Sequence, residues 1–254
     1  MFEEQRYYKR RKRDLFSGQV VSSTVKEILK QAKRHSLGNI DELRVLDVGC
    51  GSGEYSIEMA KFVSKVVGVE PFTPAYQKAI QNQKDKKNLL FVNSKIEDFK
   101  SREKFDLIMS ITTIEHMPEA KKSFNRIFEL LKPGGVLYLT APNKWWPIEQ
   151  HYLLPFLGWL PLVLANRYMQ IFGKGESYKD YSYAKSYFGM KRFFDKFPCR
   201  YEFILPSDSQ AEYLGCGSGG KVYRKVVELG IKLIRLSPYF WNFSKGFIIV
   251  AVKS

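Results

Sequence analysis

The sequence is poor in cysteine, in acidic residues relative to basic ones, and in long apolar runs. Three cysteines, Cys50, Cys199 and Cys216, are too few for a disulfide framework and suit a reducing compartment. No CxxC pair is present, so a structural zinc site is not expected. The longest apolar stretch, Tyr152 to Ala165, is too short for a membrane-spanning helix and contains two prolines. The N-terminal residues carry charges where a signal peptide needs an apolar run, so no signal peptide is expected.

Basic residues dominate the charge balance of the 254-residue chain. Lys and Arg number 41 against 26 Asp and Glu, which gives a formal net charge of +15. Hydrophobic residues make up 44% of the chain, enough to exclude a disordered protein. The densest basic run lies at residues 6–13 and contains Tyr7 and Tyr8. Such a run attracts RNA or anionic lipid, or it is a solvated tail.

From residue 44 onward, short apolar segments alternate with helical patterns. Strands are expected over 44–49, 65–70, 88–93, 105–112 and 136–142. Helices are expected over 22–36, 53–62, 74–83 and 118–131. Apolar, β-branched strands that alternate with helices predict a parallel sheet covered on both faces, and right-handed crossovers make it doubly wound.

The pattern breaks after Pro142. An aromatic-rich insertion runs from about 143 to 199 and precedes a strand at 200–205, a helix at 221–235 and a final strand at 246–252. We expect residues 44–254 to form one α/β domain with a seven-stranded, mostly parallel sheet. Residues 1–43 would form a basic extension and a helix. A second glycine cluster at 214–220 lacks a preceding apolar strand and is interpreted as a flexible connector.

The strongest local signal is the glycine loop LDVGCGSGEYS at residues 46–56, which follows a strand and opens a helix. A dinucleotide fingerprint that starts at Gly49 would need glycine at position 54, which is Glu54. A P-loop would need a Gly-Lys-Ser/Thr run, which is absent. The acids around the loop favour a cationic ligand such as S-adenosyl-L-methionine, whose carboxylate suits helix-terminal N–H groups.

Other residues extend this predicted site. Glu70 ends the second strand 21 residues after Gly49, the spacing at which an acid accepts hydrogen bonds from ribose hydroxyls. Pro71 and Phe72 follow and suit packing against adenine. The loop after the third strand contains Glu97 and Asp98, which could contact the adenine amino group.

These motifs resemble class I S-adenosylmethionine-dependent methyltransferases. VLDVGCGSG is similar to the first motif of that family, and Glu70 to its acid after the second strand. The segment FDLIMSITTIEHMPEAKKSFNRIFELLKPGGVLYLTAPN resembles the ubiquinone-biosynthesis O-methyltransferase and methyltransferase type 11 group. GFIIVAV resembles the antiparallel last strand. The resemblance covers about residues 44–143 and implies a Rossmann-like methyltransferase sheet with S-adenosyl-L-methionine as cofactor.

The resemblance also implies roles for single residues. Asp47 corresponds to the acid near the methionine amino group, and Ser110 and Ile111 to the floor beneath the methyl group. The backbone of the glycine loop would form the wall around the methionine part. The predicted cofactor-binding residues are Asp47, Gly49, Cys50, Gly51, Gly53, Glu70, Pro71, Phe72, Glu97, Asp98, Ser110 and Ile111. Cys50 is interpreted as a small packing residue, because its neighbours are acidic and a nucleophilic thiol needs a basic setting.

Glu115 and His116 follow the fourth strand, beside the expected methyl position. One group of relatives holds a divalent metal with an E-x-x-E-H set at this point. Here the first position is Thr112, so the set is incomplete and no metal is expected. His116 is the candidate general base, since the ordinary pKa of histidine suits removal of a hydroxyl proton. The alternative is that Glu115 and His116 only cap the next helix and support the loop.

The insertion after Pro142 is interpreted as a lid over the acceptor. Trp145, Trp146 and His151 are the candidate acceptor contacts, and Glu149 and His151 would otherwise only fix the lid. The run NKWWPIEQHYLLPFLGWLP is apolar enough to cover a hydrophobic acceptor or to lie on an anionic membrane surface.

The sequence therefore predicts methyl transfer from S-adenosylmethionine to an oxygen, less readily a nitrogen, of a small or lipid-like acceptor. One alternative is an RNA (tRNA) methyltransferase that uses the basic surface. Another is a non-catalytic protein that keeps the cofactor fold. The expected location is the cytoplasm, or the inner face of the membrane as a peripheral protein.

Overall fold

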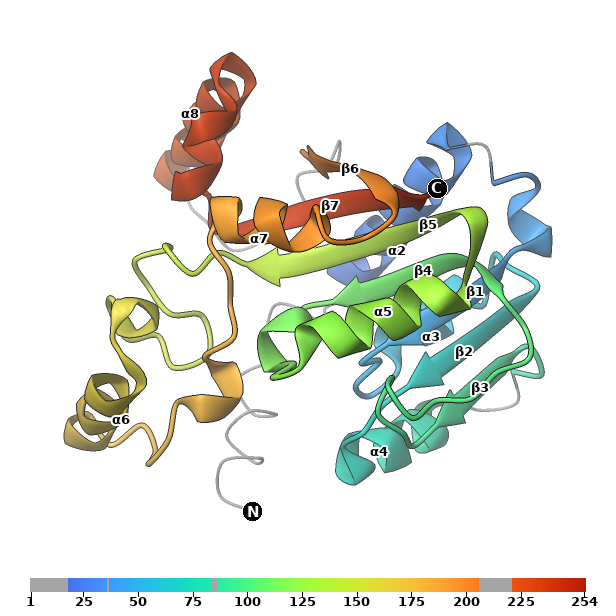
Figure 1. Cartoon of the computed structure of the whole chain (residues 1–254), viewed down its shortest axis with the longest axis horizontal. Coiled ribbons are helices and arrows are strands. Elements are labelled where there is room, and N and C mark those ends of the chain that lie inside the picture. Colours follow the sequence, from blue (N-terminus) through green and yellow to red (C-terminus); the bar gives the residue numbers. More distant parts are fainter. Residues whose placement is uncertain (1–17, 36, 84–85, 206–220) are drawn as a thin grey trace.

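The computed structural model describes residues 18–254 except 36, 84–85 and 206–220 (Figure 1). The basic run at 6–13 and the glycine cluster at 214–220 therefore lie outside the described residues. The strands are β1 (Arg44–Val48), β2 (Lys65–Val69), β3 (Leu89–Val92), β4 (Phe105–Ile111), β5 (Leu131–Pro142), β6 (Cys199–Ile204) and β7 (Gly246–Lys253). The α-helices are α2 (Gly18–Arg34), α3 (Glu54–Met59), α4 (Thr73–Gln83), α5 (Ala120–Leu130), α6 (Leu162–Ile171), α7 (Tyr187–Phe194) and α8 (Lys221–Leu236). Short 3₁₀ helices are η1 (Ile40–Glu42), η2 (Ile114–His116), η3 (Leu157–Trp159), η4 (Lys179–Tyr181) and η5 (Pro238–Phe243).

The strands form one seven-stranded sheet in the order β3-β2-β1-β4-β5-β7-β6. The first five strands in this order are parallel, and β7 runs antiparallel to both β5 and β6. The predicted doubly wound, mostly parallel sheet with an antiparallel last strand is confirmed. The order reverses between β1 and β4, and in such sheets ligands bind outside the carboxyl ends of the strands at this point.

Helices cover both faces of the sheet (Figure 1). On one face α5 and α7 pack through buried aromatic side chains, among them Phe124 and Phe194. On the other face α2 and α3 pack through residues such as Ile28 and Met59. Because α2 shares a core with β1, the helix that precedes residue 44 is part of the same packed unit.

The predicted element ranges are close to the observed ones, with two clear differences. The helix predicted over 22–36 is already formed at Gly18 and ends at Arg34. The helix predicted over 118–131 ends at Leu130, and β5 begins at Leu131 instead of residue 136. Leu131 pairs with Phe105, and the register then shifts before Val136 pairs with Leu107. The run that contains Pro133 and two glycines thus forms an irregular start of the strand, although its residues predict a turn.

Residues 144–184, called the lid below, leave the sheet after β5 and lie beyond the carboxyl ends of β4 and β5 (Figure 1). An isolated bridge joins Asn143 to Lys185, so the two ends of the lid meet. The lid has its own small core, made of Leu154, Leu157, Ala165, Met169 and Tyr178. Among the described residues, each helix falls short of the length and apolar character that crossing a bilayer requires.

Candidate active site at the carboxyl edge of the sheet

The glycine loop connects β1 to α3 with all three of its glycines in the left-handed region. The φ angles are +73° at Gly49, +55° at Gly51 and +85° at Gly53. A Cβ atom on Gly49 would lie 2.3 Å from Thr113 Cγ2, and one on Gly53 would lie 2.5 Å from the Phe91 ring. A Cβ on Gly51 would meet nothing within 4 Å. Two of the glycines therefore permit close packing, whereas Gly51 faces open space in which a ligand can approach the backbone.

Asp47, on β1 just before this loop, is a buried carboxyl group. Its side chain is 2% exposed and accepts a 2.6 Å hydrogen bond from Ser56 Oγ on α3. Burial raises the pKa of Asp47 to about 7, the Ser56 bond opposes the rise, and the charges of Glu70 and Glu54 add to it. A cation close to such a buried carboxyl group would lower its pKa again and favour the carboxylate anion.

Glu70 links the glycine loop to the turn after β2. Its Oε2 accepts a 2.9 Å hydrogen bond from the Gly51 N–H, and its Oε1 accepts one of 2.9 Å from the Phe72 N–H. Both carboxylate oxygens of Glu70 therefore face backbone N–H groups at the mouth of the glycine loop. Pro71 is exposed and Phe72 half-buried beside it. The structure thus brings together Gly51 and the predicted ribose and adenine contacts.

Cys50 is buried inside the loop. Burial raises the pKa of its thiol well above the ordinary value, and the neighbouring charges of Asp47 and Glu70 raise it further. The thiol therefore stays protonated near neutral pH, which fits the predicted packing role.

The two acids predicted after β3 lie differently. Glu97 accepts a hydrogen bond from Ser123 on α5, so its carboxylate faces that helix. Asp98 is exposed in the turn. Of the two, Asp98 is the one that a ligand can reach without breaking a bond inside the protein.

Ser110 and Ile111 are buried at the end of β4, where the chain turns toward η2. Among the described residues, Ser110 Oγ has no hydrogen-bond partner. Thr112 has φ +53°, which is uncommon for a β-branched residue, and its N–H donates a 3.0 Å bond to Thr140 Oγ1. Such local strain is concentrated at functional sites. The turn directs Glu115 and His116 toward the lid.

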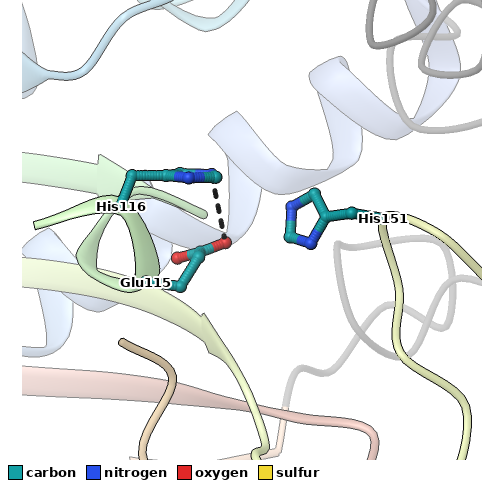
Figure 2. Close-up of side chains that lie close together, drawn as sticks. All are labelled: Glu115, His116 and His151. Carbon is teal, nitrogen blue, oxygen red and sulfur yellow. Dashed lines mark ion pairs between the residues drawn. The ribbon is translucent and has the colours of Figure 1, made fainter. Parts of the chain in front are cut away.

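Glu115 and His116 meet His151 of the lid, as Figure 2 shows. Glu115 is fully buried, and its Oε1 lies 3.9 Å from His116 Nε2. The His116 and His151 ring centroids lie 5.3 Å apart, and the Tyr181 ring lies 4.9 Å and 4.5 Å from them. One donor atom from each of Glu115, His116 and His151 lies within 4.8 Å of the others. Three donors are the number that catalytic zinc sites use, so this cluster could hold a cation, although the sequence predicted no metal.

A pocket of about 30 Å³, called the lid pocket below, opens beside this cluster, and the lid must move for it to admit anything larger than a water molecule. Trp146 and His151, two of the three predicted acceptor contacts, line it together with Glu149, Tyr178 and Tyr181. The third, Trp145, instead packs edge-on against Trp159, with ring centroids 5.6 Å apart. Trp145 is 47% exposed and is not among the pocket-lining residues in the described chain.

Three side chains at the site were not singled out from the sequence. Ser56 binds Asp47, Thr113 packs over Gly49, and Tyr181 joins the two histidines. Ser56 could have been inferred from the sequence, because a polar residue on the buried face of a short helix needs a polar partner. Tyr181 could not have been inferred, since it lies in an irregular segment without a periodic pattern.

The comparisons with known proteins agree with this fold. Residues 40–175, more than half of the chain, match the family model described as a methyltransferase domain. The ubiquinone biosynthesis O-methyltransferase of Bradyrhizobium sp. (strain ORS 278) is 29% identical over 133 residues, which are 50% of this chain and 51% of that protein. The enzyme of the same name from Rhodopseudomonas palustris (strain TIE-1) is 28% identical over 134 residues, again 50% and 51%. The chain thus spans about half the length of these curated relatives.

Two solved structures share the fold. The plantazolicin methyltransferase in complex with a monoazolic analog and SAH is 14% identical, with a TM-score of 0.60, and the match covers 99% of this chain and 90% of that one. The magnesium protoporphyrin IX methyltransferase from Synechocystis PCC 6803 with bound SAH is 16% identical, with a TM-score of 0.56, over 94% of this chain and 84% of that one. The family match and the sheet order together identify this chain as a member of the methyltransferase domain family.

Proposed function

We propose that this protein binds S-adenosylmethionine at the glycine loop and transfers its methyl group to an oxygen of a small or lipid-like acceptor in the lid pocket. The observation that carries the proposal is the juxtaposition of Asp47, Gly51 and Glu70 at the carboxyl edge of the sheet. The relatives named as O-methyltransferases support oxygen as the target, and their match extends over half of their length.

The residues present fit this cofactor. The open space at Gly51 admits a ligand against the backbone, and Glu70 beside it is an acid at the end of the second strand, the position that binds ribose hydroxyls in folds of this kind. The buried Asp47 gains from an ammonium group, because a nearby cation favours its charged form. The bound cofactor supplies a methyl group attached to a positively charged sulfur atom. The sulfur is a good leaving group, because it departs as a neutral thioether. The task of the protein is to position the acceptor and to take up its proton.

The surroundings of the lid pocket suit a hydroxyl acceptor. Trp146, Tyr178 and Tyr181 offer apolar ring surface, and His151 offers a proton-accepting nitrogen. Burial raises the pKa of Tyr178 far above its ordinary value, with smaller contributions from Glu149 and nearby groups, so this phenol stays neutral. Histidines stand on both sides, His116 on η2 and His151 on the lid. An acceptor that must lose a proton as it is methylated fits this arrangement.

The test begins with titration calorimetry of S-adenosylmethionine on the full chain. The substitution Glu70→Gln is expected to weaken binding by about 10- to 100-fold, because a charge-assisted acceptor is lost. Glu103→Gln, which alters an exposed surface pair with Lys65, is the matched control and should leave binding unchanged. Transfer of labelled methyl to pools of phenols, quinol lipids and tRNA then identifies the acceptor class. Unchanged affinity in Glu70→Gln would refute the assignment of the cofactor site.

We also propose that the protein works in the cytoplasm with the lid against the inner face of the membrane. Large exposed apolar side chains gather on the lid, with no acidic residue between 150 and 175. They are Leu153, Phe156, Trp159, Leu162, Val163, Leu164, Ile171 and Phe172. Aromatic and aliphatic groups beside Arg167 and Lys174 suit an anionic interface.

Flotation with vesicles of neutral phosphatidylcholine, with and without phosphatidylglycerol, tests the membrane proposal. The double variant Val163→Glu with Ile171→Glu should lose binding to the anionic vesicles. The matched control, Ile80→Glu with Leu90→Glu, places the same charges on exposed apolar positions of α4 and β3, which lie on the opposite side of the molecule from α6 (Figure 1). Equal flotation of both variants would exclude the lid as the contact. In the methyl-transfer assay, methylation of tRNA without methylation of phenols or quinol lipids would refute the proposed small or lipid-like acceptor.

A further inference from the structure

Glu149 holds His151 in one orientation on the lid. Its Oε2 accepts hydrogen bonds from the backbone N–H groups of His151, at 2.8 Å, and Tyr152, at 2.6 Å. Its Oε1 lies 2.8 Å from His151 Nδ1. The Glu149 side chain is only 7% exposed. The two backbone bonds fix the carboxylate, so the remaining oxygen stays directed at the imidazole.

This contact sets which ring nitrogen carries the proton. An ionised carboxylate only accepts hydrogen bonds, so Nδ1 of His151 is the donor and Nε2 of the neutral ring is left as an acceptor. The pairing matches the carboxylate–imidazole arrangement that prepares histidine as a general base. The two histidines are placed differently: Glu149 Oε1 lies 2.8 Å from Nδ1 of His151, whereas Glu115 Oε1 lies 3.9 Å from Nε2 of His116.

His151 also has the better position for an acceptor. It lines the lid pocket together with Trp146 and Tyr181. Figure 2 shows its ring across from Glu115 and His116, which come from the loop after β4. Among the described residues, the titratable groups around His151 are Glu149 on its own turn, Glu115 and His116 on the β4 side, and Tyr178 and Tyr181 on the lid.

We infer that His151, positioned by Glu149, accepts the proton of the acceptor hydroxyl, and that His116 does not. The inference rests on the proposed function. The hydroxyl proton passes to Nε2 of His151 as the acceptor oxygen bonds to the methyl carbon. The carbon–sulfur bond breaks with its electron pair going to sulfur, which leaves a neutral thioether and a methyl ether. Glu149 stabilises the imidazolium until its proton passes to water.

The first test needs no acceptor. The full chain contains three histidines, so ¹⁵N-histidine labelling with His35→Gln and His116→Gln variants assigns each ring. Long-range ¹H–¹⁵N spectra should show His151 protonated at Nδ1 in the neutral state. Glu149→Gln should give a mixture of the two tautomers, because an amide both donates and accepts. A neutral His151 protonated at Nε2 in the unmodified protein would overturn the inference.

The second test compares catechol with 4-nitrocatechol, which is already ionised at pH 8 and needs no base. His151→Gln should lower kcat for catechol by about 100-fold or more, the usual contribution of a general base. The same variant should transfer methyl to 4-nitrocatechol at close to the unmodified rate. His116→Gln is the matched control, and it should change both rates by the same factor. A purely structural role of His151 would lower both rates equally.

Each other outcome has a definite meaning. Equal losses in His151→Gln, or an acceptor-dependent loss in His116→Gln, would overturn the inference. So would loss of activity in EDTA that zinc or magnesium restores, since a cation at Glu115, His116 and His151 would then ionise the hydroxyl. Failure to bind S-adenosylmethionine in calorimetry would instead refute the proposed function. Binding without transfer to either catechol would reject a phenolic acceptor and this inference, but leave the cofactor site standing.

Discussion

Lowering the pH from 8 to 6 should weaken cofactor binding through a single group, Asp47. Its carboxyl group is buried, accepts a hydrogen bond from the Ser56 hydroxyl, and has Glu70 and Glu54 nearby. Burial is the main cause that raises its pKa to about 7. The proposed ligand brings an ammonium group, which favours the ionised carboxylate. Binding and deprotonation of Asp47 are therefore linked.

The size of the effect follows from the pKa. At pH 6, a group with a pKa of about 7 is roughly nine-tenths protonated. A cation within about 4–6 Å lowers a carboxyl pKa by about 1–3 units. With a fall of about two units, the affinity at pH 6 should be about tenfold lower than at pH 8, and about 0.8 proton should be released for each cofactor bound at pH 6.

The assay is titration calorimetry with S-adenosylhomocysteine in two buffers of different ionisation enthalpy, at pH 6 and pH 8. Asp47→Asn should abolish the proton release and flatten the pH dependence. Ser56→Ala should move the midpoint to higher pH, because the bond that lowers the pKa of Asp47 is removed. Affinity that is constant from pH 6 to 8 would refute the reasoning. Proton release that persists in Asp47→Asn would assign the titration to another group.

Further predictions concern folding stability, measured by thermal and urea unfolding. Gly49→Ala should destabilise the fold by more than about 2 kcal/mol, because its methyl would lie 2.3 Å from Thr113 Cγ2 in a left-handed backbone. Gly51→Ala meets open space and should cost only about 1 kcal/mol, yet reduce cofactor affinity; equal stability losses in the two variants would contradict this. Asp47→Asn should stabilise the cofactor-free protein at pH 8. Because the pKa of Asp47 is raised to about 7 in the folded protein, the free energy of unfolding falls as the pH rises from about 4 to about 7. If Asp47→Asn is no more stable than the unmodified protein at pH 8, the raised pKa is contradicted. Asn143→Ala should cost about 2–3 kcal/mol, since its buried Nδ2 donates to the carbonyls of Asn242 and Ser244, at 2.9 and 2.8 Å, whereas exposed Asn39→Ala should cost less than about 0.5 kcal/mol.

Much of the sheet could be predicted from the sequence because its strands are short apolar runs bounded by clear breaks. Val45, Leu46 and Val48 lie in a strand that is buried on both faces, and their apolar character alone identifies it. The glycine loop could also be predicted, since three closely spaced glycines allow the left-handed backbone that the structure shows at each of them. The start of β5 could not, because Pro133 and Gly134 favour a turn and only pairing with β4 extends the strand to Leu131.

The sequence indicated Trp146 and His151 as contacts on the lid, but the meeting of His151 with Glu115 and His116 was out of its reach. Glu115 and His116 are adjacent in the chain, but His151 meets them only because the lid folds back over the end of β4. Local spacing carries no information about such a contact. Glu97 shows the same limit, because its position after β3 suggested a ligand contact while its carboxylate is bound to Ser123 of α5. Burial and partners decide which of two adjacent acids is available.

The bridge between Asn143 and Lys185 makes the lid a structural unit that is separate from the sheet. Since its two ends meet at one point on the sheet, the 41 intervening residues 144–184 span almost no distance, and they pack around a core of their own. A segment of different length or composition could be exchanged at this bridge without moving β5, α7 or the glycine loop. Evolution or engineering can therefore exchange the lid, the proposed acceptor-binding segment, while the sheet and the glycine loop stay unchanged.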